Sequence, residues 1–160
     1  MDATRVKWIR FEMKDFNESL EEFPIIEVKE GDCVLNQGER TDSLYVLHSG
    51  KVTVIKDGYD VAITSEKGTV FGEMSIFLDK EHSASVQCMT DSTFYHIDKP
   101  QEYLESNPAF IWHIATLLSS RLYNLNQYLV DIKSQNTLFN NKSDDREKMA
   151  NDVLKILQGN

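Results

Sequence analysis

The stretch FGEMSIFLDKEHSASV, residues 71–86, carries residue types that could hold a sugar phosphate. Gly72 lets the backbone approach a ligand closely, and a helical turn beginning after it would present free N–H groups that attract anions. The carboxylate of Glu73 would repel a phosphate, but it could accept hydrogen bonds from a sugar hydroxyl. Ser83 and Ala84 add a hydroxyl and a small side chain, which let backbone amides approach a bound group. By itself, this pattern also fits an ordinary loop.

The spacing of apolar residues, and with it the expected secondary structure around this stretch, changes along the 160-residue chain. Residues 1–24 place apolar side chains at helical spacing, which predicts an N-terminal helical segment closed by Pro24. Residues 25–107 follow a period of two instead, and residues 108–135 return to the helical period. In the last segment, residues 136–160, the polar residues 136–142 predict a turn. A short terminal helix is expected after that turn.

The middle segment consists of short runs of β-branched and aromatic residues. Turn residues separate these runs at regular intervals, which is typical of a β sandwich or jelly roll. The turns fall at Gly31, Gly38, Gly50, Gly58 and Gly68. The expected fold is therefore mainly β with flanking helices, followed by a long C-terminal helix.

The long helix is expected to begin at Asn107, which can cap it, and Pro108 suits its first position. Its apolar residues recur every three or four positions and form a stripe too long for a small barrel to cover. The stripe consists of Ile111, Ile114, Leu118, Leu122, Leu125, Leu129 and Ile132. We therefore expect a homodimer formed through residues 108–135, although the stripe could instead lie across its own barrel.

Composition is that of a globular protein, with 41% hydrophobic and 27% charged residues and a net charge of −9. The length fits one domain with helical additions. An acidic chain without a Lys/Arg cluster is not expected to bind nucleic acid. No signal peptide or membrane span is visible, which predicts a cytoplasmic protein. Cys33 and Cys88 have neither disulfide-framework nor zinc-site spacing.

The stretch at residues 71–86 resembles the phosphate-binding cassette of cyclic-nucleotide-binding domains. The usual form of that cassette is F-G-E-L-A-L, followed after a few residues by P-R-A-A-T-V or E-R-S-A-x-V. The resemblance extends upstream through EGDCVLNQGERTDSLYVLHSGKVTVI and downstream to Asn107, covering residues 25–132. It implies a catabolite-activator-like β roll, a form of double-stranded β-helix or jelly roll, that binds cAMP or cGMP without a metal and stands alone without a helix-turn-helix domain.

Carried over by position, the resemblance implies that Gly72 and Ser75 lend amides to the cyclic phosphate and that Glu73 accepts from the ribose 2′-hydroxyl. Met74 and residues 76–78 are expected to serve as packing residues of the short cassette helix. The implied ligand-binding set is Phe71, Gly72, Glu73, Met74, Ser75, His82, Ser83 and Ala84. A base contact could come from Asn124, Asn126 or Tyr128, or these residues could lie in solvent or at the rim of a dimer.

His82 departs from the family, which places a phosphate-gripping arginine at this position. Arginine has a permanent charge and a planar fork, whereas histidine carries a charge only when it is protonated. An exposed imidazole would be about a quarter cationic at neutral pH. The expected result is weak or acid-favoured binding, or another ligand, and Lys80 could compensate if it points inward.

The sequence leaves three hypotheses about the function of this chain. The first is a non-catalytic cyclic-nucleotide sensor that shifts its C-terminal helix and is read by an unidentified protein effector. The second is a degenerate domain that acts as a ligand-independent dimerisation or docking module. The third is a cupin-like metalloenzyme, which needs several ligands that converge on one metal. The sequence spacing does not indicate such a set among the four histidines, His48, His82, His96 and His113. A transcription regulator is not expected, because few residues follow Ile132.

Overall fold

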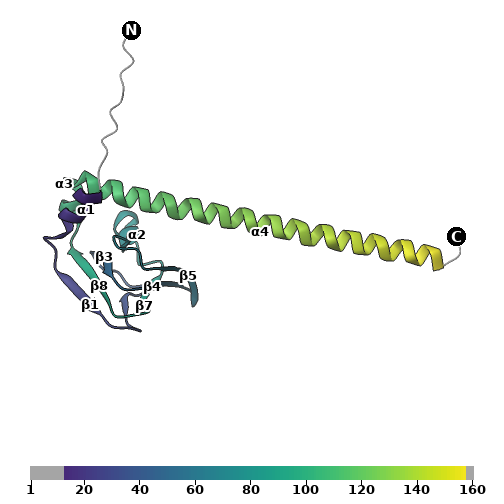
Figure 1. The fold of residues 1–160 in the computed structure, drawn as a ribbon, viewed down its shortest axis with the longest axis horizontal. Coiled ribbons are helices and arrows are strands. Elements are labelled where there is room, and N and C mark those ends of the chain that lie inside the picture. Colours follow the sequence, from purple (N-terminus) through teal and green to yellow (C-terminus); the bar gives the residue numbers. More distant parts are fainter. Residues whose placement is uncertain (1–12, 158–160) are drawn as a thin grey trace, which may run out of the picture. The chain divides into compact units, whose positions relative to one another are not determined.

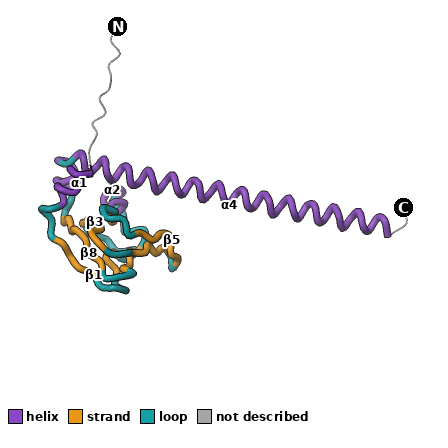
Figure 2. Tube along the Cα trace, viewed as in Figure 1, coloured by secondary structure: helices purple, strands orange, loops and turns teal. Residues whose placement is uncertain are grey.

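The computed structural model describes residues 13–157, which form a β roll with flanking helices and a long last helix (Figures 1 and 2). The chain divides into two compact units, Met1–Leu117 and Leu118–Asn160. Of the N-terminal segment predicted to be helical, residues 1–12 lie outside the described residues, and α1 spans Met13–Leu20. Among residues 13–157, no helix combines the length and the apolar composition needed to cross a membrane.

The roll consists of two four-stranded antiparallel sheets, with strand orders β1-β8-β3-β6 and β2-β7-β4-β5. The strands run in the order β1 Ile25–Val28, β2 Cys33–Leu35, β3 Ser43–Ser49, β4 Val52–Lys56, β5 Tyr59–Thr64, β6 Val70–Phe71, β7 Ser85–Cys88 and β8 Ser92–Asp98. The predicted jelly-roll-like class is confirmed. The turns predicted between the runs are also present, and the β4–β5 hairpin turns at Asp57 and Gly58, which both have positive φ.

The core lies between the two sheets, because each sheet buries one face of its alternating strands. Leu47 and Phe94 contribute from the first sheet, and Val52, Val86 and Cys88 contribute from the second. These side chains are at most 4% exposed, and Phe94 is fully buried. The short strands β2 and β6 are held by the same cluster. Leu35 at the end of β2 and Phe71 at the end of β6 both belong to it.

An aromatic cluster joins α1, α3 (Gln101–Ser106) and the first turns of α4 (Pro108–Leu157). The ring of Phe16 lies 5.2 Å from that of Phe110 and 3.8 Å from that of His113, centroid to centroid. Tyr103 contacts Phe110 edge to face, with 5.2 Å between the ring centroids. Asn107 caps α4 as predicted, because its side-chain oxygen accepts the backbone N–H of Phe110 at 3.1 Å.

One prediction about the helices was wrong, and one helix was missed. Helix α4 runs without a break through residues 136–142, where the sequence predicts a turn and then a separate helix. The polar residues there disfavour a helix only weakly, and neither proline nor glycine interrupts it. The sequence also gives no sign of α3, whose six residues bury only Leu104 and are too few to show a helical period.

The connection from β6 to α2 (Glu73–Leu78) requires glycine at residue 72. Gly72 has φ +90°, and a Cβ atom there would lie 2.7 Å from the backbone oxygen of Ser43. The sequence predicts that this glycine lets the backbone approach a ligand. In the structure, Gly72 closely approaches the first residue of β3, and its approach to a ligand stays a prediction.

We expect Gly72→Ala to destabilise the fold more than Gly31→Ala, its matched control. The φ of Gly31 is +88°, but a Cβ there would meet nothing within 4 Å. Gly31→Ala should therefore cost only the left-handed backbone penalty of about 1 to 2 kcal/mol. Gly72→Ala should cost about 1 to 3 kcal/mol more, because a backbone oxygen cannot move aside. Urea unfolding measures both, and equal losses would contradict the close approach.

Candidate functional site

Residues 71–86, called here the cassette segment, form a strand end, a short helix and a connection to β7. Gly72 precedes α2, and Asp79 ends it in the left-handed conformation with φ 52°. The backbone N–H groups of Asp79 and Lys80 both donate to the carbonyl of Ser75, the second at 3.2 Å. The Ser75 hydroxyl donates to the carbonyl of Lys80. The segment therefore folds back on itself, and the side chain of Ser75 is used inside the protein.

The predicted ligand-binding residues lie at very different depths. Glu73, Ser75 and His82 are each at most 5% exposed, and Phe71 belongs to the core. Ser83 is exposed and Ala84 is half-buried. Their roles in binding a cyclic nucleotide stay predictions.

The outer face of α2 is apolar and open to solvent. Met74, Phe77 and Leu78 are 45%, 49% and 55% exposed, so the prediction that they pack the cassette helix was wrong for these three residues. Ile76, the fourth residue of that prediction, is half-buried. The short helix has only one face against the roll, and Glu73 and Ser75 occupy that face instead. The buried side of this helix is therefore polar.

His82 fastens the cassette segment to the loop between β2 and β3, residues 36–42. Its backbone N–H donates to the carbonyl of Glu39 at 2.8 Å, and its carbonyl accepts the N–H of Gly38 at 2.9 Å. Its Nε2 lies 2.9 Å from the hydroxyl oxygen of Thr41. Three hydrogen bonds thus join His82 to three residues of the 36–42 loop, which are Gly38, Glu39 and Thr41.

Burial lowers the pKa of the His82 imidazole below its usual value, and the nearby carboxylate of Glu39 opposes that shift only in part. The imidazole is therefore mostly neutral at neutral pH. The charge expected for an exposed imidazole therefore does not apply to His82, which is buried. Periodicity does not reveal that this side chain points to Thr41. His82 is a poor source of positive charge for a phosphate.

Gln37 fixes the other end of the 36–42 loop. Its backbone N–H donates to the hydroxyl of Ser85 at 2.9 Å. Its side-chain amide donates to the Asp57 carboxylate at 2.7 Å and accepts the Asp57 backbone N–H at 2.9 Å. The loop is therefore held on the start of β7 and on the β4–β5 turn, as well as on His82.

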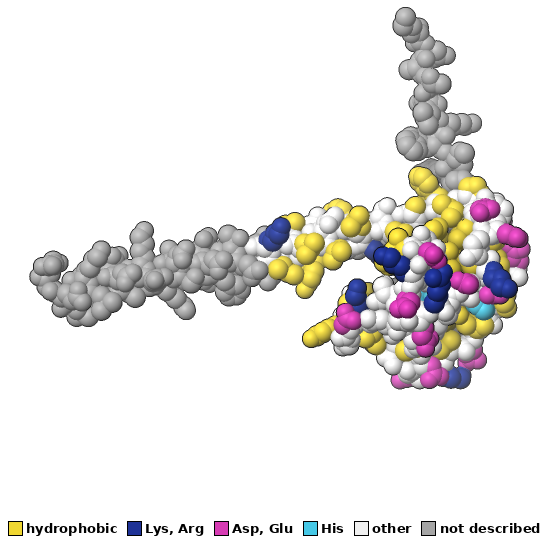
Figure 3. Space-filling view, turned by 180° about the vertical axis from the view of Figure 1, so that it is seen from behind, with side chains coloured by type: hydrophobic (Ala, Val, Ile, Leu, Met, Phe, Trp, Pro, Cys, Tyr) yellow, Lys and Arg dark blue, Asp and Glu magenta, His cyan; other side chains and the backbone are white. Residues whose placement is uncertain are grey.

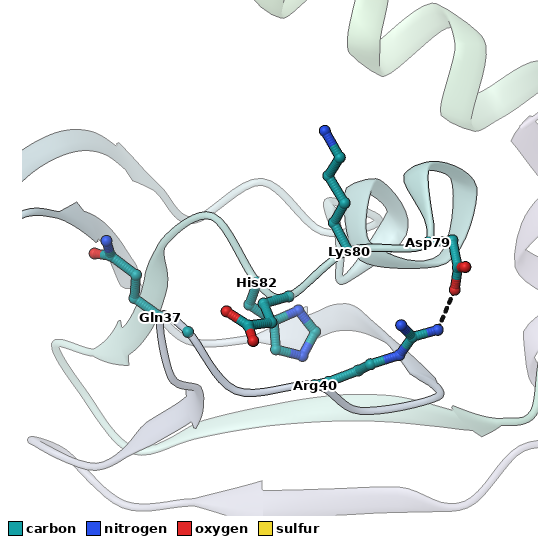
Figure 4. Close-up of a pocket in the computed structure, with 7 residues that line it drawn as sticks. Gln37, Arg40, Asp79, Lys80 and His82 are labelled. Atoms are coloured by element: carbon teal, nitrogen blue, oxygen red, sulfur yellow. Dashed lines mark hydrogen bonds and ion pairs between the residues drawn. The ribbon is translucent and has the colours of Figure 1, made fainter.

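A pocket of about 570 Å³ lies between this loop and the cassette segment (Figure 4). Its volume falls within the range of about 300 to 1,000 Å³ that is typical of small-molecule sites. The lining residues are Gln37, Gly38, Arg40, Asp79, Lys80, Glu81 and His82. Of the residues predicted to bind a ligand, this pocket includes only His82.

Arg40 was missed by the sequence reasoning. Its guanidinium reaches across the pocket and forms an ion pair with the carboxylate of Asp79 (Figure 4). Lys80, which the sequence indicated as a substitute cation, lines the same pocket. An arginine in a polar turn gives no signal by its spacing, so only the fold reveals that it faces the cassette segment.

The other histidines are used within the fold. His48 lies 3.0 Å from the Thr93 hydroxyl, His96 lies 3.1 Å from the Ser43 hydroxyl, and His113 donates from Nε2 to the carbonyl of Gly68 at 2.8 Å. Within the described part of the chain, no three His, Cys, Asp or Glu residues are grouped so as to hold a metal ion.

The residues predicted to contact a base lie in the second unit. Asn124, Asn126 and Tyr128 are exposed on α4. Their contact with a nucleotide base stays a prediction.

We expect His82 to make the fold less stable in mild acid. A buried base with a lowered pKa binds its proton less readily when folded than when unfolded, so its contribution is present above about pH 6.5 and is lost as the pH falls below that value. Urea unfolding at about pH 7.5 and about pH 5.5 should show a larger loss of stability for the wild type than for His82→Gln. An equal loss would contradict the neutral, buried imidazole.

Comparison with known proteins places the roll in a family. Residues 25–103 match the model of the cyclic nucleotide-binding domain. The cAMP-dependent protein kinase regulatory subunit of Schizosaccharomyces pombe is 33% identical over 44% of this chain and 17% of its own length. The cGMP-dependent protein kinase egl-4 of Caenorhabditis briggsae is 26% identical over 78% of this chain and 15% of its own length.

A solved structure gives the same result. The catabolite activator protein of Thermus thermophilus superposes with a TM-score of 0.62 and 25% identity, covering 74% of this chain and 58% of that one. In the comparison with the two kinase relatives, the chain spans less than a fifth of the length of each relative. Through residues 25–103, the chain belongs to the cyclic nucleotide-binding domain family.

Proposed function

We propose that this chain is a cyclic-nucleotide sensor that binds cAMP or cGMP and relays binding through α4 to a protein partner. The observation that carries the proposal is that the pocket is walled by residues of the cassette segment, Asp79 to His82, within a domain of this family. The buried carboxylate of Glu73 and the small residues at 83 and 84 agree with the family pattern. No catalytic step is part of this function.

A physical connection supports the relay. The His113 side chain of α4 donates to the carbonyl of Gly68, just before β6, and β6 leads directly into Gly72 and α2. A shift of the cassette segment would therefore pull on the turn that holds the first part of α4. A ligand shifts such an equilibrium only by the difference between its affinities for the two states.

The exposed stripe of α4 supports a homodimer. Leu122, Leu125, Leu129 and Ile132 are 58%, 53%, 48% and 36% exposed. Figure 3 shows hydrophobic side chains along the part of α4 that it colours. Apolar residues at heptad-like spacing on a solvent-facing helix are typical of a helix that pairs with a second copy.

A ligand-independent docking module is the second candidate. It is favoured by His82, because the imidazole is neutral and already bonded to Thr41. In this case the pocket would be a remnant, and dimerisation through α4 would be the function that remains. Titration with cyclic nucleotide separates the two candidates.

We expect the wild type to bind cAMP or cGMP weakly and His82→Arg to bind about tenfold to a hundredfold more tightly, because arginine adds charge-assisted hydrogen bonds. The backbone bonds of residue 82 to Gly38 and Glu39 do not depend on its side chain and should remain. Isothermal titration calorimetry with both nucleotides measures this. His82→Gln, which adds no charge, is the matched control, and unfolding curves check that each variant is folded. No binding by either the wild type or His82→Arg would favour the docking module.

The double variant Leu125→Glu/Leu129→Glu should convert a dimer to a monomer, because it places charges in the apolar seam. Gln127→Glu is the control, since residue 127 lies on the opposite side of the helix. Light scattering coupled to size-exclusion chromatography gives the mass of each. A dimeric double variant, or a monomeric wild type, would rule out pairing through this stripe.

A further inference from the structure

The pocket needs a source of positive charge if it is to hold a phosphate, and His82 does not supply one. Among the residues that line the pocket, Arg40 and Lys80 are the cations, while Asp79 and Glu81 are the opposing anions. Lys80 extends away from Arg40 in the close-up (Figure 4). Arg40 instead crosses the pocket, so it is the cation that a ligand entering between the 36–42 loop and the cassette segment would meet.

The backbone on both sides of Arg40 is fixed on the cassette segment. The carbonyl of Glu39 accepts the His82 backbone N–H at 2.8 Å, and the Thr41 hydroxyl lies 2.9 Å from His82 Nε2. The residue that replaces the family's arginine thus holds the loop that presents another arginine. A positioned guanidinium loses less freedom on binding than a free one, which favours a bidentate contact with a phosphate.

The present partner of Arg40 is easily displaced. The Arg40 and Asp79 side chains are 51% and 83% exposed, and ion pairs this exposed contribute little to stability. A phosphate could take the place of the Asp79 carboxylate while that carboxylate turns into water. The ion pair is therefore not expected to prevent an anion from reaching the guanidinium.

We propose that Arg40, rather than His82, holds the phosphate of the cyclic nucleotide and makes this pocket select an anionic ligand over a neutral nucleoside. This inference rests on the proposed function. Arginine is charged throughout the neutral range, so the selection should not depend on protonation of His82. The charged groups around the guanidinium are Asp79 and Asp42, together with Lys80 and Glu81 in the pocket lining.

The test compares cAMP and cGMP with adenosine and guanosine by isothermal titration calorimetry at low salt. Arg40→Gln should weaken cyclic-nucleotide binding about tenfold to a hundredfold and leave nucleoside binding unchanged. Asp79→Asn should strengthen cyclic-nucleotide binding, because it frees the guanidinium, and asparagine keeps the left-handed backbone at that position. Lys56→Gln removes an exposed charge that does not line the pocket and is the matched control.

The outcomes separate the two proposals. If the wild type binds a cyclic nucleotide and Arg40→Gln binds it equally well, the role of Arg40 is overturned and the sensor function stands. If Arg40→Gln weakens nucleoside and nucleotide binding alike, the variant has disturbed the loop, and a phosphate contact is again overturned. If the wild type binds neither nucleotide, the proposed function itself fails, and the assignment of Arg40 fails with it.

Discussion

The hydrogen bonds between His82 and the 36–42 loop hold the two walls of the candidate site together. They bring the end of the cassette segment against the turn after β2, and the pocket exists because these two segments meet. A buried imidazole that bonds a neighbouring hydroxyl adds order at the cost of charge, since burial disfavours its protonated form. We infer that the site takes its cation from Arg40 in the 36–42 loop, since His82 stands where the family resemblance implies an arginine.

The architecture could be predicted from sequence because its signals are periodic. Short β-branched runs between glycine turns predict the two-sheet roll, and Phe16 and Leu20 are buried as the spacing of the N-terminal segment suggests. Asn107 and Pro108 mark the start of α4, because capping and proline geometry are local properties. The end of α4 was not predictable, since polar composition at residues 136–142 is only a weak indicator of a turn.

The short helix of the cassette segment could be predicted from sequence, but the arrangement of the side chains around it could not. The direction of each side chain depends on tertiary contacts that spacing does not encode. Gly72 faces the carbonyl of Ser43, and Arg40 lies far from the cassette segment in sequence but pairs with Asp79. The same holds for the apolar outer face of α2, because a helix of six residues shows no reliable period.

We propose that this pocket holds a cyclic nucleotide through Arg40 of the 36–42 loop, while His82 serves to hold that loop. A crystal structure of the protein grown with cAMP would decide this. We expect density for the nucleotide between the loop and the cassette segment, with phosphate oxygens within hydrogen-bond distance of the Arg40 guanidinium and with His82 still bonded to Thr41. A phosphate bound elsewhere, or an Arg40 still paired with Asp79 beside an empty pocket, would contradict it.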